Sequence, residues 1–500
     1  MTRRRRLLAY VLLLLCGSSL LWSARDAAAP MWDQSRHAWN ALRVAEILER
    51  GALHEIPAWR DGVYAVAAYL PAALAHLVFG RSYDVATAAM TLFWTPVLLL
   101  SVFSLARRLH GNDDLAGGLA AAWIAASPMV IDFAKDFLLD LPIAALVALA
   151  LALLVRSGFL ADRGGAIAFG AALGSLLLTK AAMPATFLLF PLGYAAWLAW
   201  RERRLRAFSV NAASACVIAA AIAAPFYAAG FLVAQRRASG GASGLASTLI
   251  ASQVANALHE GDPGSLGDSL LFYLRALVDV QARGPLLLFP IAGLVLLALR
   301  NRPVAIFAAG SIIALVPWLA FPNKDPRYTL PLLVFLAVAA GGLAPRTKRA
   351  RIAAAVAGAA VATACVLAVQ WGIGSDRGGY LRGRPRSEPP LAAAVLEFIE
   401  RDSRSRGANW TPVVQLDLGV ADSRFFNSWN FQHYRLVLGR RVDVVPDPGL
   451  PLGAARAPDY VLVGRRATEE PRAPTIGGRL ARTWPLPEEG AAVDLWGLER

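Results

Sequence analysis

Long apolar blocks separated by short polar segments dominate the pattern of this chain. A helix needs roughly 17 to 25 apolar residues to cross about 30 Å of hydrocarbon, and blocks of about that length recur along most of the sequence. We therefore predict a mostly α, polytopic transmembrane bundle with eleven spanning helices, at 7–24, 84–106, 115–131, 139–155, 166–180, 183–200, 208–228, 284–299, 303–321, 328–344 and 352–371.

One further apolar block, 63–79, decides the topology. If it crossed the membrane, the basic clusters at 107–108 and 201–206 would lie outside. If it lies along the membrane surface, every strong basic cluster falls on one side, which the positive-inside rule makes cytoplasmic. We therefore expect a cytoplasmic N-terminus, an outer C-terminus, and outer segments at 25–83, 132–138, 229–283, 322–327 and beyond 372.

The first apolar block has two interpretations. Arg3–Arg6, the apolar run and Ala27–Ala29 resemble a secretory signal with a small-residue cleavage site. The run is about 18 residues long and many spans follow it, so an uncleaved first span is favoured over a signal peptide.

Polar and turn-forming residues return after the last block. Segment 391–399 has the pattern of an amphipathic helix. Three short strands are indicated, at Val413–Leu418, Tyr460–Val463 and Val493–Trp496. The chain thus divides into a membrane module, 1–371, and a small outer α/β domain, 372–500.

Composition and charge agree with a membrane protein. Apolar residues make up 57% of the chain and charged residues 17%, against about 25% charged in an ordinary globular protein. The net charge of +15 would fit nucleic-acid binding, but the predicted cytoplasmic segments hold 18 basic and four acidic residues. The charge is therefore an orientation signal, and no nucleic-acid partner is expected. Cys16, Cys216 and Cys365 lie inside apolar blocks, which excludes a disulfide framework.

Charges at the membrane boundary carry the candidate chemistry, because placing them there is costly unless function or pairing compensates. Asp33 follows directly after the first span, where a carboxylate would lie at the outer surface near an acceptor hydroxyl. The alternative is an N-cap for a helix that begins near Ser35.

A second charged group lies in the turn between the third and fourth predicted spans. It consists of Asp132, Lys135, Asp136 and Asp140. Asp136 and Asp140 would share one face if the next helix began early. The alternative is a solvated turn whose acids favour a helix start.

Lysine is rare among the 50 basic residues, yet Lys135, Lys180 and Lys324 all lie at the predicted outer boundary. A compact ammonium in an arginine-biased sequence indicates a phosphate contact. Arg327 and Tyr328 follow Lys324 closely, and this segment predicts a site for an anionic headgroup. An interfacial anchor is the alternative.

Metal ligation has little support in the sequence. His259 and Glu260 in the 229–283 loop have no histidine at a ligand spacing. We expect no cofactor and no metal site, with a divalent metal as the alternative.

Several of these features occur in the order found in a known enzyme group. The aspartate after the first span precedes a helix ending Ala45–Leu48, an interfacial block ending Phe79–Gly80 and a span ending Leu105–Gly111. Gly174–Lys180 and Arg327–Pro331 follow. Together these resemble the multispanning glycosyltransferases of the GT-C superfamily, in particular family 39, which contains protein mannosyltransferases and aminoarabinose transferases. The resemblance covers about residues 1–345.

The resemblance implies a GT-C-like bundle that moves a sugar from a polyprenyl-phosphate carrier to an acceptor glycan, lipid or protein on the outer face, with inversion. Asp33 resembles the catalytic aspartate of this family, which implies a general base on the acceptor hydroxyl. Lys180 and the Arg327–Tyr328 pair match elements near the carrier phosphate, where cations stabilise the charge that develops on the departing group.

Other positions match the family less directly. Asp136 and Asp140 fall where related enzymes carry an acid that positions substrate, and Arg60 falls roughly where relatives place a phosphate-binding basic residue. Many relatives follow the first aspartate with a second acid, whereas this chain has Gln34. That departure removes the second carboxylate and any metal role it would share.

Two other function classes compete with the enzyme. A transporter or flippase for an anionic lipid or glycolipid would use the same cations, but should show paired broken helices and charges near mid-membrane. A non-enzymatic assembly subunit would leave Asp33 without chemistry. The expected location is the bacterial inner membrane.

Overall fold

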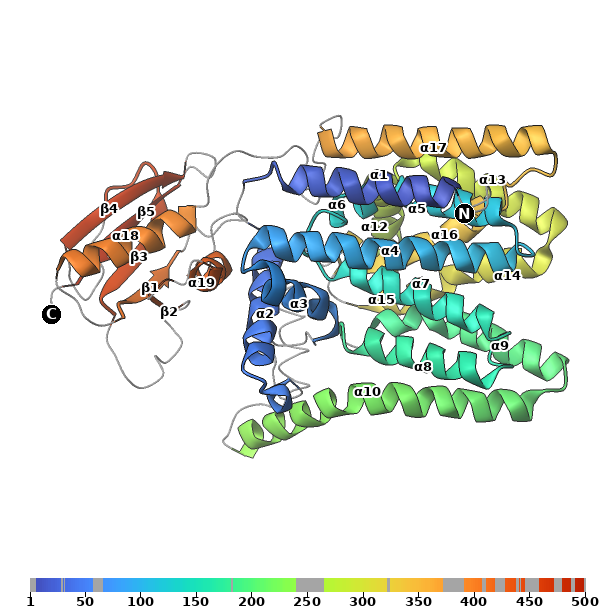
Figure 1. Ribbon diagram of the computed structural model, residues 1–500, viewed down its shortest axis with the longest axis horizontal. Coiled ribbons are helices and arrows are strands. Elements are labelled where there is room, and N and C mark those ends of the chain that lie inside the picture. The colour runs from blue at the N-terminus through green and yellow to red at the C-terminus, as the bar shows by residue number, and fades with distance from the viewer. Residues whose placement is uncertain are drawn as a thin grey trace. The chain divides into compact units, whose positions relative to one another are not determined.

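The computed structural model describes residues 6–27, 30, 32–56, 66–180, 183–239, 265–321, 324–371, 391–406, 411–418, 428–437, 440, 442–445, 458–471, 479–486 and 491–498. The chain forms two compact units. The first unit comprises 1–23, 47–71 and 88–384, and the second comprises 24–46, 72–87 and 385–500. Each unit is described by itself below, with the element labels of Figure 1.

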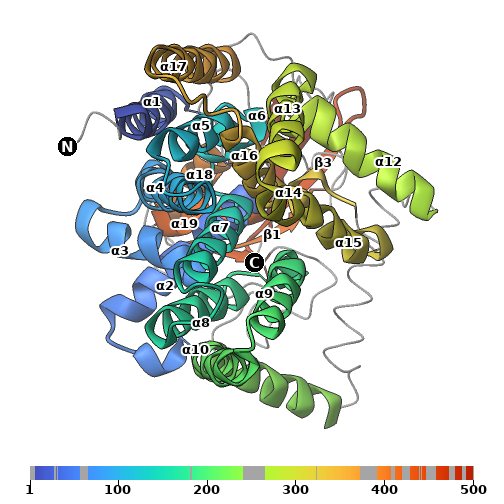
Figure 2. The same cartoon turned by 90° about the vertical axis from the view of Figure 1, so that its right-hand side faces the viewer.

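Helices make up the first unit (Figures 1 and 2). The long α-helices are α1 (Arg6–Ser23), α4 (Tyr83–Leu109), α5 (Asp114–Ala125), α7 (Asp140–Arg156), α8 (Arg163–Leu177), α9 (Leu189–Arg201), α10 (Leu205–Ser239), α12 (Leu266–Ala276), α13 (Gly284–Arg300), α16 (Leu332–Gly341) and α17 (Lys348–Trp371). Shorter elements connect them: η2 (Leu53–Glu55), η3 (Ala67–Tyr69), α6 (Pro128–Phe133), η4 (Met183–Leu188), η5 (Leu277–Gln281), α14 (Arg302–Ala309), η6 (Gly310–Leu315), α15 (Val316–Ala320) and η7 (Pro326–Thr329).

Helical structure occupies each of the eleven predicted span ranges, and the chain is a multi-pass membrane protein. Among the described residues, five helices are long and apolar enough to cross a membrane alone. A sixth is obtained if α12–η5 and α13, bent by 108°, count as one span. The other ranges contain short or interrupted helices. For example, 115–131 divides into α5 and α6 just before Pro128, where a proline suits a helix start but not a helix interior.

The apolar block at 63–79 forms η3 and the ten-residue helix α3 (Leu70–Phe79) within the described residues. At 1.5 Å per residue, α3 rises about 15 Å, which is half of the hydrocarbon thickness. The helix alone is too short to cross the membrane, and its position along the membrane surface stays a prediction.

Close packing in the first unit depends on small residues. Thirteen of the 17 residues of α7 and nine of the ten residues of α16 are buried. A Cβ atom at Gly170 of α8 would overlap the carbonyl oxygen of Ala215 in α10, so only glycine permits this approach. Small residues are favoured between membrane helices because lipid supplies no hydrophobic driving force for their association.

The second unit contains a five-stranded sheet in the order β2-β1-β3-β5-β4. Its strands are β1 (Val413–Asp417), β2 (Asp443–Val445), β3 (Tyr460–Arg466), β4 (Arg479–Leu486) and β5 (Ala491–Gly497). β1 pairs with β2 and β3 in parallel, and β5 pairs with β3 and β4 antiparallel. The helices are α2 (Trp32–Glu49), α3, α18 (Leu391–Ser405) and α19 (Ser428–Val437).

The predicted α/β domain is confirmed, with α18 and strands at all three predicted positions. Val395, Ile399, Leu462 and Val493 are fully buried in its core. The sequence pattern did not indicate β2 or β4. β2 has only three residues, and β4 is an edge strand with several exposed polar residues and Pro485, so neither has a continuous apolar run.

Candidate functional site

The end of α6, the turn after it and the first residue of α7 hold four charged side chains in the interior of the first unit. Asp132 and Lys135 are fully buried, and Asp136 and Asp140 are 1% and 5% exposed. The turn is therefore not solvated, although Asp140 does lie in the first turn of a helix, as the alternative expected. α7 begins at Asp140, so Asp136 precedes the helix and the two aspartates do not share a helical face.

Lys135 has its charge balanced inside the protein. Its Nζ lies 3.1 Å from Oδ1 of Asp132 and 4.1 Å from the centroid of the Trp22 ring. Both charged side chains of the pair are fully buried. A buried ion pair of this kind is strongly destabilised when one partner is removed, because the other charge is left uncompensated.

Asp140, Lys180 and Tyr328 come together from three distant parts of the sequence. α8 ends at Leu177, and the Thr179 hydroxyl donates a hydrogen bond to the Ser175 carbonyl just before Lys180. The Lys180 ammonium lies 3.7 Å from the Asp140 carboxylate and 4.6 Å from the centroid of the Tyr328 ring. Three residues that the sequence singled out for phosphate or substrate contact therefore form one cluster.

The Lys180 ammonium is held loosely. A separation of 3.7 Å is too long for a hydrogen bond to the carboxylate, so the attraction is mainly coulombic. The lysine side chain is 22% exposed, whereas that of Asp140 is nearly buried. The ammonium can therefore accept a second anion at short range without first breaking a tight pair.

Aromatic rings pack around Tyr328 in the cluster. The Tyr328 ring lies 5.3 Å from that of Trp318 and 6.3 Å from that of Phe321, measured between centroids. Trp318 in turn lies 6.0 Å from Phe187. The rings fix the orientation of Tyr328, so that its face is available to the ammonium.

The two other cations of this segment have local partners. The Lys324 ammonium donates hydrogen bonds to the carbonyls of Trp318, Leu319 and Phe321 at and just after the end of α15. Those bonds occupy all three of its donors and stabilise the helix C-terminus. Arg327 pairs with Asp325, with its Nη2 2.5 Å from Oδ2.

Gln281 and Asp325 were missed by sequence reasoning, yet they position the Arg327–Tyr328 segment. The Gln281 side-chain amide donates hydrogen bonds to the Pro326 carbonyl and, at 2.8 Å, to Thr329 Oγ1. Asp325 accepts a hydrogen bond from the backbone N–H of Arg327. The available signal for Gln281 was a lone amide directly after the apolar stretch 270–280, which must find partners when buried.

Asp33 belongs to the second unit and lies half-buried in the first turn of α2. α2 begins at Trp32, so the alternative of an N-cap for a helix beginning near Ser35 does not describe this end. A carboxylate in the first turn is stabilised by the positive end of the helix dipole.

Residues of α19 hold the start of α2 within the second unit. The Asn430 amide donates a 3.0 Å hydrogen bond to the Pro30 carbonyl, and the Ser35 hydroxyl donates one of 3.3 Å to Asn430 Oδ1. Tyr83 donates to Gln34, and its ring contacts His433 edge-on. The C-terminal segment thus supports the turn that carries Asp33.

His433 is neutral in this environment. It is fully buried, and burial together with the charge of His76 lowers its pKa to about 3. The imidazole therefore acts as a packing group for Tyr83 at ordinary pH.

Some predicted positions cannot be placed. Arg60, His259 and Glu260 lie outside the described residues. Within the ranges that are described, no three His, Cys, Asp or Glu side chains are grouped to hold a metal ion.

Comparison with known proteins identifies the fold. No protein-family model and no curated protein sequence matches this chain. The crystal structure of ArnT from Cupriavidus metallidurans in the apo state matches with a TM-score of 0.57 and 16% identity, over 97% of this chain and 98% of that one. The structure of ArnT bound to undecaprenyl phosphate matches with a TM-score of 0.55 and 17% identity, over the same shares. This chain has the ArnT fold.

The expected GT-C-like architecture is therefore confirmed as a fold over nearly the whole chain, including the C-terminal domain beyond residue 345. At 16% to 17% identity the structural match shows a shared fold and does not assign roles to residues.

Proposed function

We propose that this protein is a membrane glycosyltransferase that uses a polyprenyl-phosphate-linked sugar donor. The cluster of Asp140, Lys180 and Tyr328 carries the proposal, because it offers a partly exposed ammonium beside a buried carboxylate. The fold supports it, since an ArnT structure of the same architecture binds undecaprenyl phosphate.

Lys180 is assigned to the carrier phosphate. A phosphate oxygen can approach the ammonium more closely than the 3.7 Å that separates it from Asp140. When the bond from the sugar to the phosphate breaks, negative charge grows on the phosphate, and a fixed cation stabilises that charge. Arg327 is assigned as a second cation, while Lys324 holds the segment through its three carbonyl bonds.

Asp33 is assigned as the general base. Its carboxylate takes the proton of the acceptor hydroxyl as that oxygen forms a bond to the anomeric carbon. The bond from this carbon to the phosphate oxygen breaks on the opposite side, so the configuration inverts. Asp136 and Asp140 are assigned to positioning the sugar, and Arg60 to a further phosphate contact. The proposal contains no metal step.

The proposed reaction takes place at the outer face of the bacterial inner membrane, with the N-terminus in the cytoplasm. The acceptor is a glycan, lipid or protein on that face. This arrangement follows from the basic clusters, which the positive-inside rule places on the cytoplasmic side.

Binding of undecaprenyl phosphate to the purified protein tests the phosphate site. Lys180→Ala should weaken binding about 10- to 100-fold, because a charge-assisted hydrogen bond contributes about 1.5–3 kcal/mol. Arg300→Ala, which removes an exposed cation at the end of α13, is the control and should bind as wild type does. Equal affinities for the two variants would remove the phosphate role of Lys180.

Transfer of a labelled polyprenyl-phosphate sugar pool to membrane acceptors tests the base. Asp33→Asn should lower the rate about 10²- to 10⁴-fold while binding of undecaprenyl phosphate stays unchanged. Asp417→Asn, an exposed carboxylate of β1 in the same unit, is the control. Wild-type transfer by Asp33→Asn would show that another group takes the proton.

The transporter alternative has one observation in its favour, the 108° bend between α12–η5 and α13. A transporter built from inverted repeats would present two such breaks in corresponding positions. The described residues contain one. Movement of the labelled lipid across a bilayer by Asp33→Asn, without transfer, would favour this alternative.

A further inference from the structure

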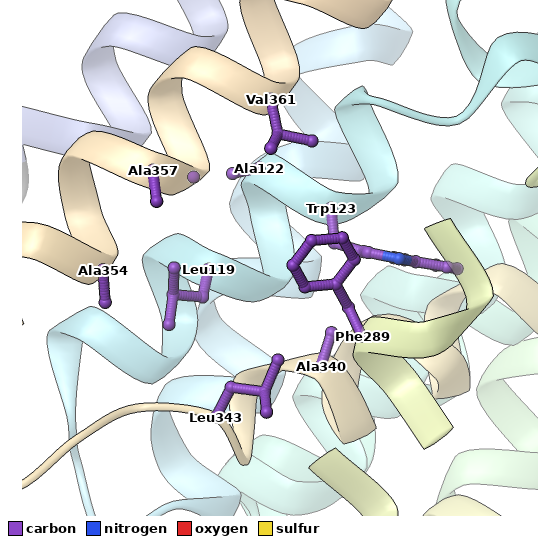
Figure 3. A pocket seen from close by; sticks show the side chains of 10 residues that line it. Leu119, Ala122, Trp123, Phe289, Ala340, Leu343, Ala354, Ala357 and Val361 are labelled. Carbon is purple, nitrogen blue, oxygen red and sulfur yellow. The ribbon is translucent and has the colours of Figure 1, made fainter. Parts of the chain in front are cut away.

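A cavity of 260 Å³ opens between α5, α13, α16 and α17 in the first unit (Figure 3). Trp123 of α5 lines the cavity. Its indole N–H donates a 2.8 Å hydrogen bond to the Leu286 carbonyl, so the side chain offers no free polar group to a ligand. The lining side chains are all apolar. Phe289 is 40% exposed and Ala357 is exposed, so the cavity reaches the surface of the bundle.

The cavity lies near the basic end of its helices. Ala354, another lining residue, is six residues after Lys348 along α17, a rise of about 9 Å, and Val361 is a further 10 Å or so along. On the opposite wall, Leu343 is only three residues before Arg346. Half of a hydrocarbon core is about 15 Å, so the cavity lies mainly at the depth of the acyl chains on the basic side.

Three exposed cations lie at that end without an acidic partner. Arg346, Lys348 and Arg349 make no ion pair with any carboxylate in the described part of the chain. Arg351, by contrast, forms a 2.6 Å ion pair with Asp113, whose pKa the guanidinium holds below its usual range. The charge of the first three residues is therefore available to an external anion.

We propose that this cavity binds one acyl chain of an anionic diacyl phospholipid, with the headgroup against Arg346, Lys348 and Arg349. Along α17, the apolar lining begins about 9 Å from the cation Lys348. The apolar cavity suits the acyl chain of such a molecule, and the unpaired cations suit its anionic headgroup. Clusters of basic residues beside a membrane helix attract anionic headgroups, at about 1 kcal/mol for each residue near the surface. The site is separate from the Asp140–Lys180–Tyr328 cluster and does not depend on sugar transfer.

Native mass spectrometry of the full-length protein tests the site, with dioleoyl phosphatidylglycerol and dioleoyl phosphatidylcholine offered in equal amounts. Wild type should retain one phosphatidylglycerol in preference to phosphatidylcholine. Ala357→Phe should fill the cavity and lower retention at least tenfold. Val356→Phe places the same ring at a lipid-facing position of α17 outside the cavity and should leave retention unchanged.

The headgroup contact is tested by replacing Arg346, Lys348 and Arg349 together with Gln. This variant should still bind lipid but lose its preference for phosphatidylglycerol. Arg300 and Arg302, replaced together by Gln, remove two exposed cations elsewhere on the predicted cytoplasmic side and are the control.

Three outcomes would overturn the proposal. They are equal retention by Ala357→Phe and Val356→Phe, equal retention of the two lipids by wild type, and displacement of phosphatidylglycerol by equimolar undecaprenyl phosphate. The last would assign the cavity to the carrier tail instead. A thermal unfolding midpoint within a few degrees of wild type establishes that each variant is folded. Retention that falls in a folded Ala357→Phe protein supports the site even if no sugar transfer is ever measured.

Discussion

Two lysines of the first unit each pair with an aspartate, one in α6 and one at the start of α7, and the two pairs differ in distance and in exposure to solvent. Lys135 lies 3.1 Å from Asp132, with both side chains fully buried. Lys180 lies 3.7 Å from Asp140, and the lysine is 22% exposed. The first pair is fully enclosed by the protein, while the second leaves room for another anion. Burial and distance therefore separate a lysine that stabilises the fold from a lysine suited to bind a ligand.

Removing the charge of each lysine should give the largest difference in stability between the two pairs. Lys135→Met leaves Asp132 as a buried uncompensated charge and should lower the free energy of unfolding by about 3–5 kcal/mol. Lys180→Met should cost about 1 kcal/mol or less, since partly exposed pairs contribute little. Thermal unfolding of the purified protein in detergent measures both.

A double variant provides the control for this prediction. Lys135→Met combined with Asp132→Leu removes both charges and should recover most of the lost stability, because an apolar pair replaces a buried ion pair at little cost. A Lys135→Met protein as stable as Lys180→Met would contradict the comparison.

Exchanging lysine for arginine keeps the charge and tests the space around it. Lys135→Arg must fit a larger guanidinium into a filled interior and should cost about 1–3 kcal/mol of stability. Lys180→Arg should be neutral for stability, and its affinity for undecaprenyl phosphate should stay within a few-fold of wild type. Similar losses of stability in the two variants would show that the Lys180 site is as closed as the other.

Substitution of Tyr328 should have the smallest effect, and it should act on binding of undecaprenyl phosphate. Tyr328→Leu removes the ring face below the ammonium, which contributes about 0.5–2 kcal/mol, so binding of undecaprenyl phosphate should weaken by about 2- to 30-fold. Tyr328→Phe keeps the ring and should bind as wild type does. If the two variants are equally weak, the hydroxyl and not the ring face is what matters.

The residues of the site were predictable to different degrees. Lys180 and Tyr328 stand out in the sequence because charged and amphipathic groups at the ends of long apolar blocks are costly and therefore informative. Lys324 stands out for the same reason, yet its ammonium caps α15. The cost of placing a cation at the boundary identifies the position, but it does not tell whether a ligand or a helix end compensates it.

The contact partners of these residues could not be predicted, because the partners are distant in sequence. Lys180 meets Asp140 across 40 residues and Tyr328 across almost 150. Asn430 reaches Pro30 across 400, which joins the C-terminal segment to the turn that carries Asp33. No periodic pattern of apolar residues encodes such separations.

The sequence by itself determined that this chain is a multi-pass helical protein with a small α/β domain, because helix-length apolar blocks have no other stable solution in a bilayer. It also marked the few boundary charges worth examining. Only the tertiary structure decided which of those charges are held in buried ion pairs or bound to helix ends, and which remain accessible to a ligand. Distances of a few tenths of an ångström and the exclusion of solvent make that difference, and both arise from packing between segments far apart in the chain.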